Sequence, residues 1–225
     1  MIASEAPGLP VVETFHSLQG EGLHAGRSAF FIRLAGCTVG CPWCDTKHSW
    51  PAGVHPERGL ADLAAEASAA AAAGAAFVVI TGGEPLHHRL DPLCEALDQA
   101  TSSPDQPGGL PLHLETSGVD PLSGRFDWIT LSPKRHRPPT NELLGACQEL
   151  KVVVEQAEDL AFAEAMAAAA VKQAAARISV GGTPPQLLLQ PAWGHPEGQV
   201  LALAFVQSQP AWRLSLQSHK WLGVR

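Results

Sequence analysis

The sequence predicts an α/β fold in which about six parallel strands form an incomplete (β/α) TIM-like barrel with a reduced set of helices. Short apolar segments alternate with helix-like segments along the chain, and this alternation favours a parallel sheet with helices packed on it. A complete eight-unit barrel usually takes about 250 residues, whereas this chain has 225. That length suits one substantial core better than two, so we expect a single domain over residues 1–225.

The first half of the chain contains three expected strands and two expected helices. Residues 29–36 (AFFIRLAG) and 77–83 (FVVITGG) are apolar runs that end in glycine, as strands that lead into a turn do. The alanine-rich segment 59–74 between them predicts a helix. A second helix is expected at about 91–100, before a Pro/Gly-rich loop at 102–111 and a strand within 112–118 (LHLETSG).

The second half continues the alternation. Four short apolar segments bounded by turn residues predict strands, within residues 128–133 (WITLSP), 149–155 (ELKVVVE), 186–191 (QLLLQP) and 213–217 (RLSLQ). Helices are expected at 159–176 and 197–207. Parallel strands end at the same rim of a sheet, so we expect the glycine and polar residues that follow the strands to gather there.

Charge and composition narrow the function classes. The formal net charge is -7, and no lysine/arginine cluster is longer than PKRHR at 133–137, which argues against a non-specific grip on nucleic acid or an anionic membrane. A small or anionic metabolite is the better ligand. No apolar run is long enough to span a bilayer, so we expect a cytoplasmic protein. Clustered cysteines in a reducing compartment hold metal more often than they form disulfides.

Three of the five cysteines form a C-x3-C-x2-C pattern in a loop that follows an expected strand: Cys37, Cys41 and Cys44. One interpretation is a structural zinc site completed by His48, although zinc ligands usually come as two pairs and no second C-x2-C occurs. The other is a 4Fe-4S cluster in which three thiolates bind three irons and leave the fourth iron open. Cys94 and Cys147 stand apart, and we expect them to be ordinary buried thiols.

The cysteine pattern, with Trp43 before its last cysteine, resembles the signature of the radical S-adenosylmethionine (SAM) enzymes, in which SAM binds the open iron. TGGEP at 81–85 resembles the glycine-rich strand end where that family receives the SAM ammonium. Gly82 and Gly83 would allow a close backbone approach there, and Glu84 would contact the ammonium. The resemblance therefore implies a 4Fe-4S cluster and SAM as cofactors.

Further motifs resemble one branch of these enzymes, the 7-carboxy-7-deazaguanine synthase family. They are SLQGEG (17–22), CDT (44–46), ETSG (115–118), SPK (132–134), ELKVVV (149–154), LQP (189–191) and RLSLQSHK (213–220). The resemblance implies a carbon-nitrogen lyase that converts 6-carboxy-5,6,7,8-tetrahydropterin into 7-carboxy-7-deazaguanine with loss of ammonia, in the biosynthesis of queuosine, a tRNA modification, and other 7-deazapurines. SAM would serve as a regenerated source of a 5'-deoxyadenosyl radical, and no side chain would act as an acid-base catalyst.

Carried over by position, the resemblance assigns three groups of residues. Cys37, Cys41 and Cys44 would bind the cluster in the loop 37–44, and Thr46 would bind Mg²⁺ together with substrate and water oxygens. The SAM group would be Trp43, Cys44, Asp45, Gly82, Gly83, Glu84, Glu115, Ser132, Pro133 and Lys134. The substrate group would be Leu18, Gln19, Gly20, Glu21, Arg33, Thr81, Gln190 and His219.

Within the substrate group, Glu21 would read the amino-pyrimidine edge of the pterin and Arg33 its carboxylate. The expected partners are the small-molecule pterin, an external electron donor such as a flavodoxin and a second copy of the chain in a homodimer, with no nucleic acid and no membrane. A different radical SAM enzyme, such as a glycyl-radical activase, would share the three cysteines and TGGEP. It would have no reason to carry Gln19, Glu21, Arg33 and His219.

Overall fold

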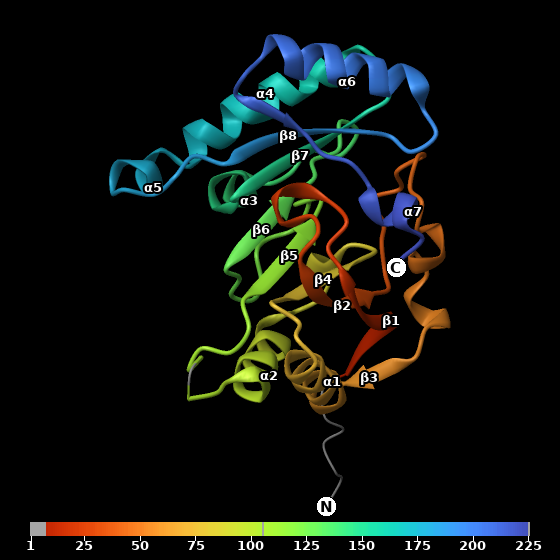
Figure 1. Ribbon diagram of the computed structural model, residues 1–225, viewed down its shortest axis with the longest axis vertical. Coiled ribbons are helices and arrows are strands. Elements are labelled where there is room, and N and C mark those ends of the chain that lie inside the picture. The colour runs from red at the N-terminus through yellow and green to blue at the C-terminus, as the bar shows by residue number, and fades with distance from the viewer. Residues whose placement is uncertain (1–7, 105, 225) are drawn as a thin grey trace, which may run out of the picture.

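The computed structural model describes residues 8–104 and 106–224, which form one nine-stranded sheet with helices packed on it (Figure 1). The strand order is β3-β1-β2-β4-β5-β6-β7-β8-β9. Parallel pairing links β2 (Ser28–Leu34), β4 (Val78–Gly82), β5 (Leu112–Thr116), β6 (Trp128–Leu131), β7 (Glu149–Val154), β8 (Gln186–Pro191) and β9 (Trp212–Leu214). Within the described residues β9 does not pair with β3, so the barrel is incomplete, as the sequence predicts.

Two antiparallel strands extend the sheet beyond β2, and the sequence analysis anticipated neither. β1 (Gly8–Leu18) pairs with β2 and, on its other side, with the short β3 (Glu57–Gly59). β1 carries Pro10 and mixes polar with apolar residues, as a partly exposed strand near the edge of a sheet can. The sheet therefore has seven neighbouring strands that pair in parallel, instead of about six, and β1 and β3 join it through antiparallel pairing.

The larger helices cover the two ends of the sheet. α1 (Leu60–Ala72) and α2 (Asp91–Thr101) lie side by side below β4 and β5, whereas α4 (Glu158–Gln173) and α6 (Pro196–Ser208) lie over β7 and β8 (Figure 1). The helix expected at 159–176 ends at Gln173, and a separate α5 (Ala175–Ser179) follows it. Two further short helices, α3 (Asn141–Ala146) and α7 (Ser218–Leu222), were not predicted. No helix in the described part of the chain has the length and apolarity needed to cross a membrane.

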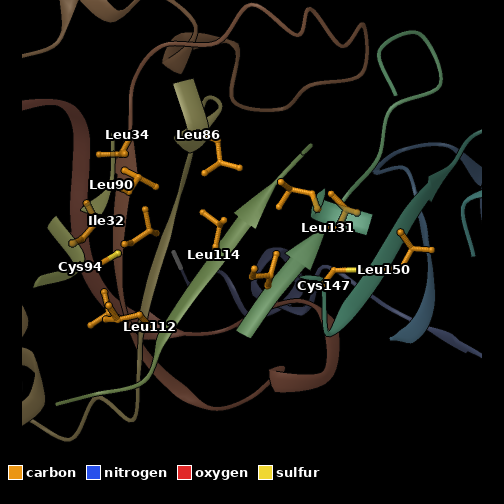
Figure 2. Packing of buried hydrophobic residues seen from close by; sticks show 14 of the residues in the cluster. Ile32, Leu34, Leu86, Leu90, Cys94, Leu112, Leu114, Leu131, Cys147 and Leu150 are labelled. Atoms are coloured by element: carbon orange, nitrogen blue, oxygen red, sulfur yellow. The ribbon is translucent and has the colours of Figure 1, made fainter. Parts of the chain in front are cut away.

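Alternation along each strand sends one set of side chains to the helices and the other into the barrel. Ile32 and Leu34 of β2 join Leu112, Leu114, Leu131 and Leu150 in the main hydrophobic core, which the sheet shares with the helices (Figure 2). Ala29, Phe31, Phe77 and Val79 form a second buried cluster. The inward positions beyond that cluster, toward the carboxyl ends of the strands, carry polar side chains, and these line the candidate site.

Candidate active site

Inward-facing polar residues from neighbouring strands meet in one cavity. Arg33 of β2 pairs in register with Thr81 of β4, and each lies two residues after an inward apolar residue. Glu115, Lys151 and Gln190 occupy inward positions on β5, β7 and β8. All five line a cavity of about 360 Å³, which lies at the carboxyl-end rim, as expected for a parallel barrel.

The loop that follows β2 brings the three clustered cysteines to this cavity. Backbone hydrogen bonds from Gly36 N to Ser49 O (2.8 Å) and from Cys37 N to Trp50 O (3.0 Å) close the loop. Cys37, Cys41 and Cys44 all line the cavity, and burial raises the pKa of the Cys37 and Cys41 thiols. Three thiols on one wall, facing open space, suit a cluster that bridges them, and bound iron would keep them deprotonated.

The alternative zinc site is not formed by the described residues. His48 is exposed and does not line the cavity. No group of three or more His, Cys, Asp or Glu side chains in residues 8–104 and 106–224 converges on a single metal ion. A tetrahedral zinc site needs four ligands around one point, so the geometry favours the bridging cluster.

The glycine-rich strand end packs directly against the cysteine loop. Gly82 has a φ of +134°, and a Cβ atom there would lie 2.1 Å from Leu34 O. A Cβ atom on Gly83 would lie 2.4 Å from Gly36 O. Hydrogen bonds from Gly83 N to Leu34 O and from Glu84 N to Gly36 O, both 2.9 Å, fix this contact. The glycines are therefore required by the approach of two backbones.

Glu84 is buried at the foot of this contact, with 1% of its surface exposed. Its Oε1 accepts hydrogen bonds from Leu86 N (3.2 Å) and Thr116 Oγ1 (2.5 Å), and its Oε2 accepts from the backbone N and the hydroxyl of Ser117. A carboxylate offers about four acceptor positions, and the protein fills all four. Glu84 thus joins the ends of β4 and β5, and contact with a SAM ammonium would require one of these bonds to be exchanged.

The other residues assigned to SAM and Mg²⁺ lie around the cavity with one exception. Lys134 donates to Ser132 Oγ (2.7 Å), and burial lowers the Lys134 pKa. Thr46 Oγ1 lies 3.5 Å from Cys44 Sγ. Pro133 is buried but is not among the lining residues. The assigned residues that line the cavity on this side are Trp43, Cys44, Asp45, Thr46, Gly82, Gly83, Glu84, Glu115, Ser132 and Lys134.

On the other side of the cavity, Glu21 is the centre of a buried hydrogen-bond network. Its carboxylate accepts from Lys151 Nζ, from Gln190 Nε2 (3.1 Å) and from Gln217 Nε2 (2.8 Å). Burial raises the pKa of Glu21, but the charge of Lys151 and these donors outweigh burial and lower it to about 2. Glu21 is therefore an anion at neutral pH.

Every residue assigned to the substrate lines the cavity: Leu18, Gln19, Gly20, Glu21, Arg33, Thr81, Gln190 and His219. Glu115, assigned to SAM, accepts hydrogen bonds from Gln19 Nε2 and Thr81 Oγ1, both at 2.9 Å. It thus lies at the boundary between the two groups. A Cβ atom on Gly20 would lie 2.1 Å from His219 Nδ1, so glycine is needed for His219 to reach its place.

Arg33 has a partner within the protein. Its Nε donates to Glu13 Oε1 on β1 at 3.1 Å, and its guanidinium carbon lies 5.9 Å from the centre of the Phe15 ring. The arginine side chain remains 20% exposed and lines the cavity. The charge that interrupts the apolar strand is therefore paired, and its partner belongs to a strand that the sequence analysis did not anticipate.

Three polar residues that connect parts of the site had no role assigned in the sequence analysis: Lys151, Gln217 and Lys220. Lys220 Nζ donates to Asp45 Oδ2 (2.6 Å) and to Gln217 Oε1 (3.0 Å), while Ser218 N donates to Gly20 O (2.9 Å). α7 therefore connects the substrate-side loop with the cysteine loop. The signal for Lys151 was a lysine within the apolar run ELKVVV, because a buried charge needs a partner.

Comparisons with known proteins find relatives that match nearly the whole chain. The radical SAM superfamily model matches residues 31–134, which run from β2 past the cysteine loop to Lys134. A 7-carboxy-7-deazaguanine synthase from Prochlorococcus marinus is 54% identical over 221 residues, covering 96% of this chain and 98% of the relative. Enzymes of the same name from Synechocystis and Escherichia coli are 49% and 32% identical over 96% of this chain, covering 93% and 98% of the relatives.

A solved structure has the same fold. QueE from Escherichia coli superposes with a TM-score of 0.71 at 30% identity, covering 94% of this chain and 95% of that one. The sequence relatives span nearly the whole chain, including the residues on both sides of the cavity. The chain therefore belongs to the 7-carboxy-7-deazaguanine synthase family, a carbon-nitrogen lyase branch of the radical SAM enzymes.

Proposed function

We propose that this enzyme converts 6-carboxy-5,6,7,8-tetrahydropterin into 7-carboxy-7-deazaguanine with loss of ammonia, using SAM as a regenerated cofactor and Mg²⁺. The observation that carries the proposal is one cavity of about 360 Å³ lined both by three clustered thiols and by the polar set around Glu21 and Arg33. Cavities of this size hold small ligands. The activity named for the relatives supports the reaction, and the side chains support the substrate.

The cysteine side of the cavity would hold the cofactors. Cys37, Cys41 and Cys44 would bind a 4Fe-4S cluster, which supplies the one-electron chemistry that generates a radical from SAM. Ser132 and Lys134 would contact SAM, and the bare backbone at Gly82 and Gly83 keeps that wall free of side chains. Trp43 lies edge-on against His136 with ring centres 5.9 Å apart, and we propose that this pair would limit the access of water to this end.

The opposite side would hold the pterin. The guanidine-like edge of a pterin presents N-H donors, for which an ionised Glu21 and the amides of Gln19 and Gln190 are suitable partners. The substrate carboxylate would bind Arg33, whose Nε already donates to Glu13. Holding the ligand at both ends would present the pterin carbon to the cofactor side in one orientation.

Thr46 would contribute the protein oxygen to Mg²⁺, with substrate and water oxygens completing the shell, as is usual for this ion. Thr46 Oγ1 lies 3.5 Å from Cys44 Sγ, so Thr46 would hold the metal beside the cysteine loop. We further propose that residues 1–225 act as a single radical SAM domain in the cytoplasm, as a homodimer, with electrons from an external donor such as a flavodoxin.

An anaerobic assay tests the proposal. The reconstituted protein is supplied with the carboxy-tetrahydropterin, SAM, Mg²⁺ and dithionite, and mass spectrometry follows the deazaguanine product. We expect product only when SAM and reductant are present, together with an iron-sulfur absorbance that dithionite bleaches. SAM cleavage without deazaguanine would instead identify a different radical SAM activity.

The Mg²⁺ assignment is tested by titrating the metal in the wild type and in Thr46→Ala. The variant should need more Mg²⁺ for the same turnover and should bind SAM as the wild type does, because the metal would contact substrate and not the cluster. An unchanged Mg²⁺ dependence would remove Thr46 from the metal site.

A further inference from the structure

Lys151 is a buried cation at the wall of the cavity. It lies on the inner face of β7, only 5% exposed, and its Nζ donates to Glu21 Oε2. Burial lowers the pKa of a lysine, but the charges of Glu21, Glu115 and Glu149 outweigh burial and raise the Lys151 pKa. Lys151 is therefore protonated at neutral pH. A charge removed from water to this extent is costly unless its partners are well arranged.

The charged side chains around Lys151 differ in their hydrogen-bond partners. Glu149, two residues away on the same face of β7, accepts from Leu23 N (3.0 Å) through Oε2, and its Oε1 has no partner among the described residues. Burial raises the pKa of Glu149. Glu115 is held by Gln19 and Thr81. Lys134, in the loop after β6, is a like charge that lies close enough to Lys151 for the two to repel each other. Glu21 is thus the carboxylate to which Lys151 donates.

The network also sets how Glu21 is presented. Gln190 Oε1 accepts from Ser215 Oγ (2.8 Å) and Gln217 Oε1 accepts from Lys220 Nζ (3.0 Å), so both amides turn their nitrogen atoms toward Glu21. Among the residues that the structure describes, three donors then occupy three of the roughly four acceptor positions of its carboxylate. The remaining position, on Oε1, belongs to a side chain that lines the cavity.

We propose that Lys151 is a positioning residue for substrate recognition, which holds the Glu21 carboxylate in place so that its free acceptor position receives an N-H of the pyrimidine edge of the substrate. The inference rests on the proposed function, because it takes the pterin as the ligand. It adds a residue that acts through Glu21 without touching the ligand itself. Lysine suits this role because its ammonium donates to Oε2 of Glu21, which leaves an acceptor position on Oε1 for the ligand.

The test compares Lys151→Met with the wild type and with Lys172→Met, which removes an exposed lysine from α4. In the anaerobic assay we expect the KM for pterin to rise tenfold or more in Lys151→Met, with unchanged iron content and unchanged KM for SAM. Lys172→Met should match the wild type. Without Lys151, burial would dominate the Glu21 pKa and raise it, so the pterin KM of the variant should rise further on acidification. The wild-type KM should lack this acid dependence.

A double-mutant cycle separates positioning from direct contact. If Lys151 acts through Glu21, then Glu21→Gln/Lys151→Met should have the pterin KM of Glu21→Gln alone. Additive effects would mean that Lys151 contacts the substrate and would overturn the positioning role. The double variant removes both charges together, so it is expected to fold even if Lys151→Met does not.

The outcomes also separate this inference from the proposed function. A wild-type enzyme that forms no deazaguanine would remove the function on which the inference rests. A wild type that turns over, with a Lys151→Met variant of lower melting temperature and unchanged pterin KM at every pH, would leave the function standing. In that case Lys151 would only stabilise the fold.

Discussion

The five cysteines of this chain fall into two environments that predict different chemistry. Cys37, Cys41 and Cys44 face the cavity, whereas Cys94 and Cys147 lie in the hydrophobic core (Figure 2). Burial raises the pKa of Cys94 to about 11 and that of Cys147 to about 12. Both core thiols are therefore protonated at neutral pH and unsuited to bind iron.

Cys41→Ala should lose most of the bound iron and all SAM cleavage, because three thiolates anchor a cluster with one open iron. Cys94→Ala and Cys147→Ala should keep wild-type iron content and lose roughly 1 kcal/mol of stability to the small cavity left by the sulfur. Iron analysis measures the iron content, and urea unfolding measures the free energy of unfolding. Loss of iron in a core variant, or retained SAM cleavage in Cys41→Ala, would contradict the assignment.

Arg33 serves two partners in our proposal, and its replacement separates them. Arg33→Ala should lower kcat/KM for the pterin, and the fall should correspond to a loss of about 2 kcal/mol of transition-state stabilisation. This is the low end for a charged contact, because the side chain is partly exposed. Arg33→Lys should recover only part of this loss, because lysine cannot make a two-pronged contact with a carboxylate. Measured together, the pterin KM, iron content and melting temperature decide: a lower melting temperature with unchanged KM would show that Arg33 only pairs with Glu13.

At the scale of elements, α7 depends on its contacts. A helix of five residues has little stability alone, and α7 is held by Ser218 on Gly20 and by Lys220 on Asp45. The helix begins directly after Gln217 and carries His219, and both of these residues line the cavity. This short element thus contacts both the cysteine loop and the loop that carries Gly20.

Lys220→Met should raise the KM for pterin several-fold, because Gln217 loses the donor that orients its amide toward Glu21. The change in melting temperature should be small, since the lost pair with Asp45 is partly exposed and such pairs contribute about 0–1 kcal/mol. Arg125→Met, which removes another exposed ion pair at Asp98, is the matched control. An equal KM in the two variants would show that α7 does not reach the substrate.

Sequence reasoning succeeded where apolar runs ended in glycine or proline, as in β4 and β8. It missed β1 because Pro10, Glu13 and His16 interrupt the apolar pattern, and that pattern matters less for a partly exposed strand. Motif resemblance selected residues that line the cavity, apart from Pro133. It did not reveal that Glu84 is already saturated or that Lys151 pairs with Glu21, because Thr116 lies 32 residues from Glu84 and Lys151 lies 130 residues from Glu21.

At the scale of the whole molecule, an aromatic layer fills the barrel on the amino-end side of the cavity. His113 stacks on Phe77 with ring centres 4.2 Å apart, and His24 lies edge-on against Trp128 at 4.5 Å. Burial, helped by the charges of His24 and Arg27, lowers the pKa of His113 to about 3. The folded protein therefore keeps this imidazole neutral.

This layer predicts a pH dependence of stability. Below pH 6.5, the ordinary histidine pKa, His113 binds a proton in the unfolded chain but not in the folded protein. The contribution of His113 to the free energy of unfolding is therefore fully present above pH 6.5 and is lost as the pH falls toward 3. By linkage the loss between pH 7.5 and 5.5 is about 1 kcal/mol. Urea unfolding of His113→Phe at equal iron content should show a smaller acid loss than the wild type. An identical loss would mean that other groups dominate.

The cavity also joins segments from opposite ends of the chain, and this sets an order of assembly. The cysteine loop is closed on itself by short-range bonds such as Ser49 N to Thr46 O, which need only the early part of the chain, whereas His136 and Arg137 reach its backbone from 97 and 99 residues later. Glu21 and Gly20 instead wait for Gln217 and Ser218, which lie 196 and 198 residues later. During synthesis a ribosome must release almost the entire chain before the substrate side can close. A nascent chain can thus close the cysteine loop on itself long before it can complete the side of the cavity around Glu21.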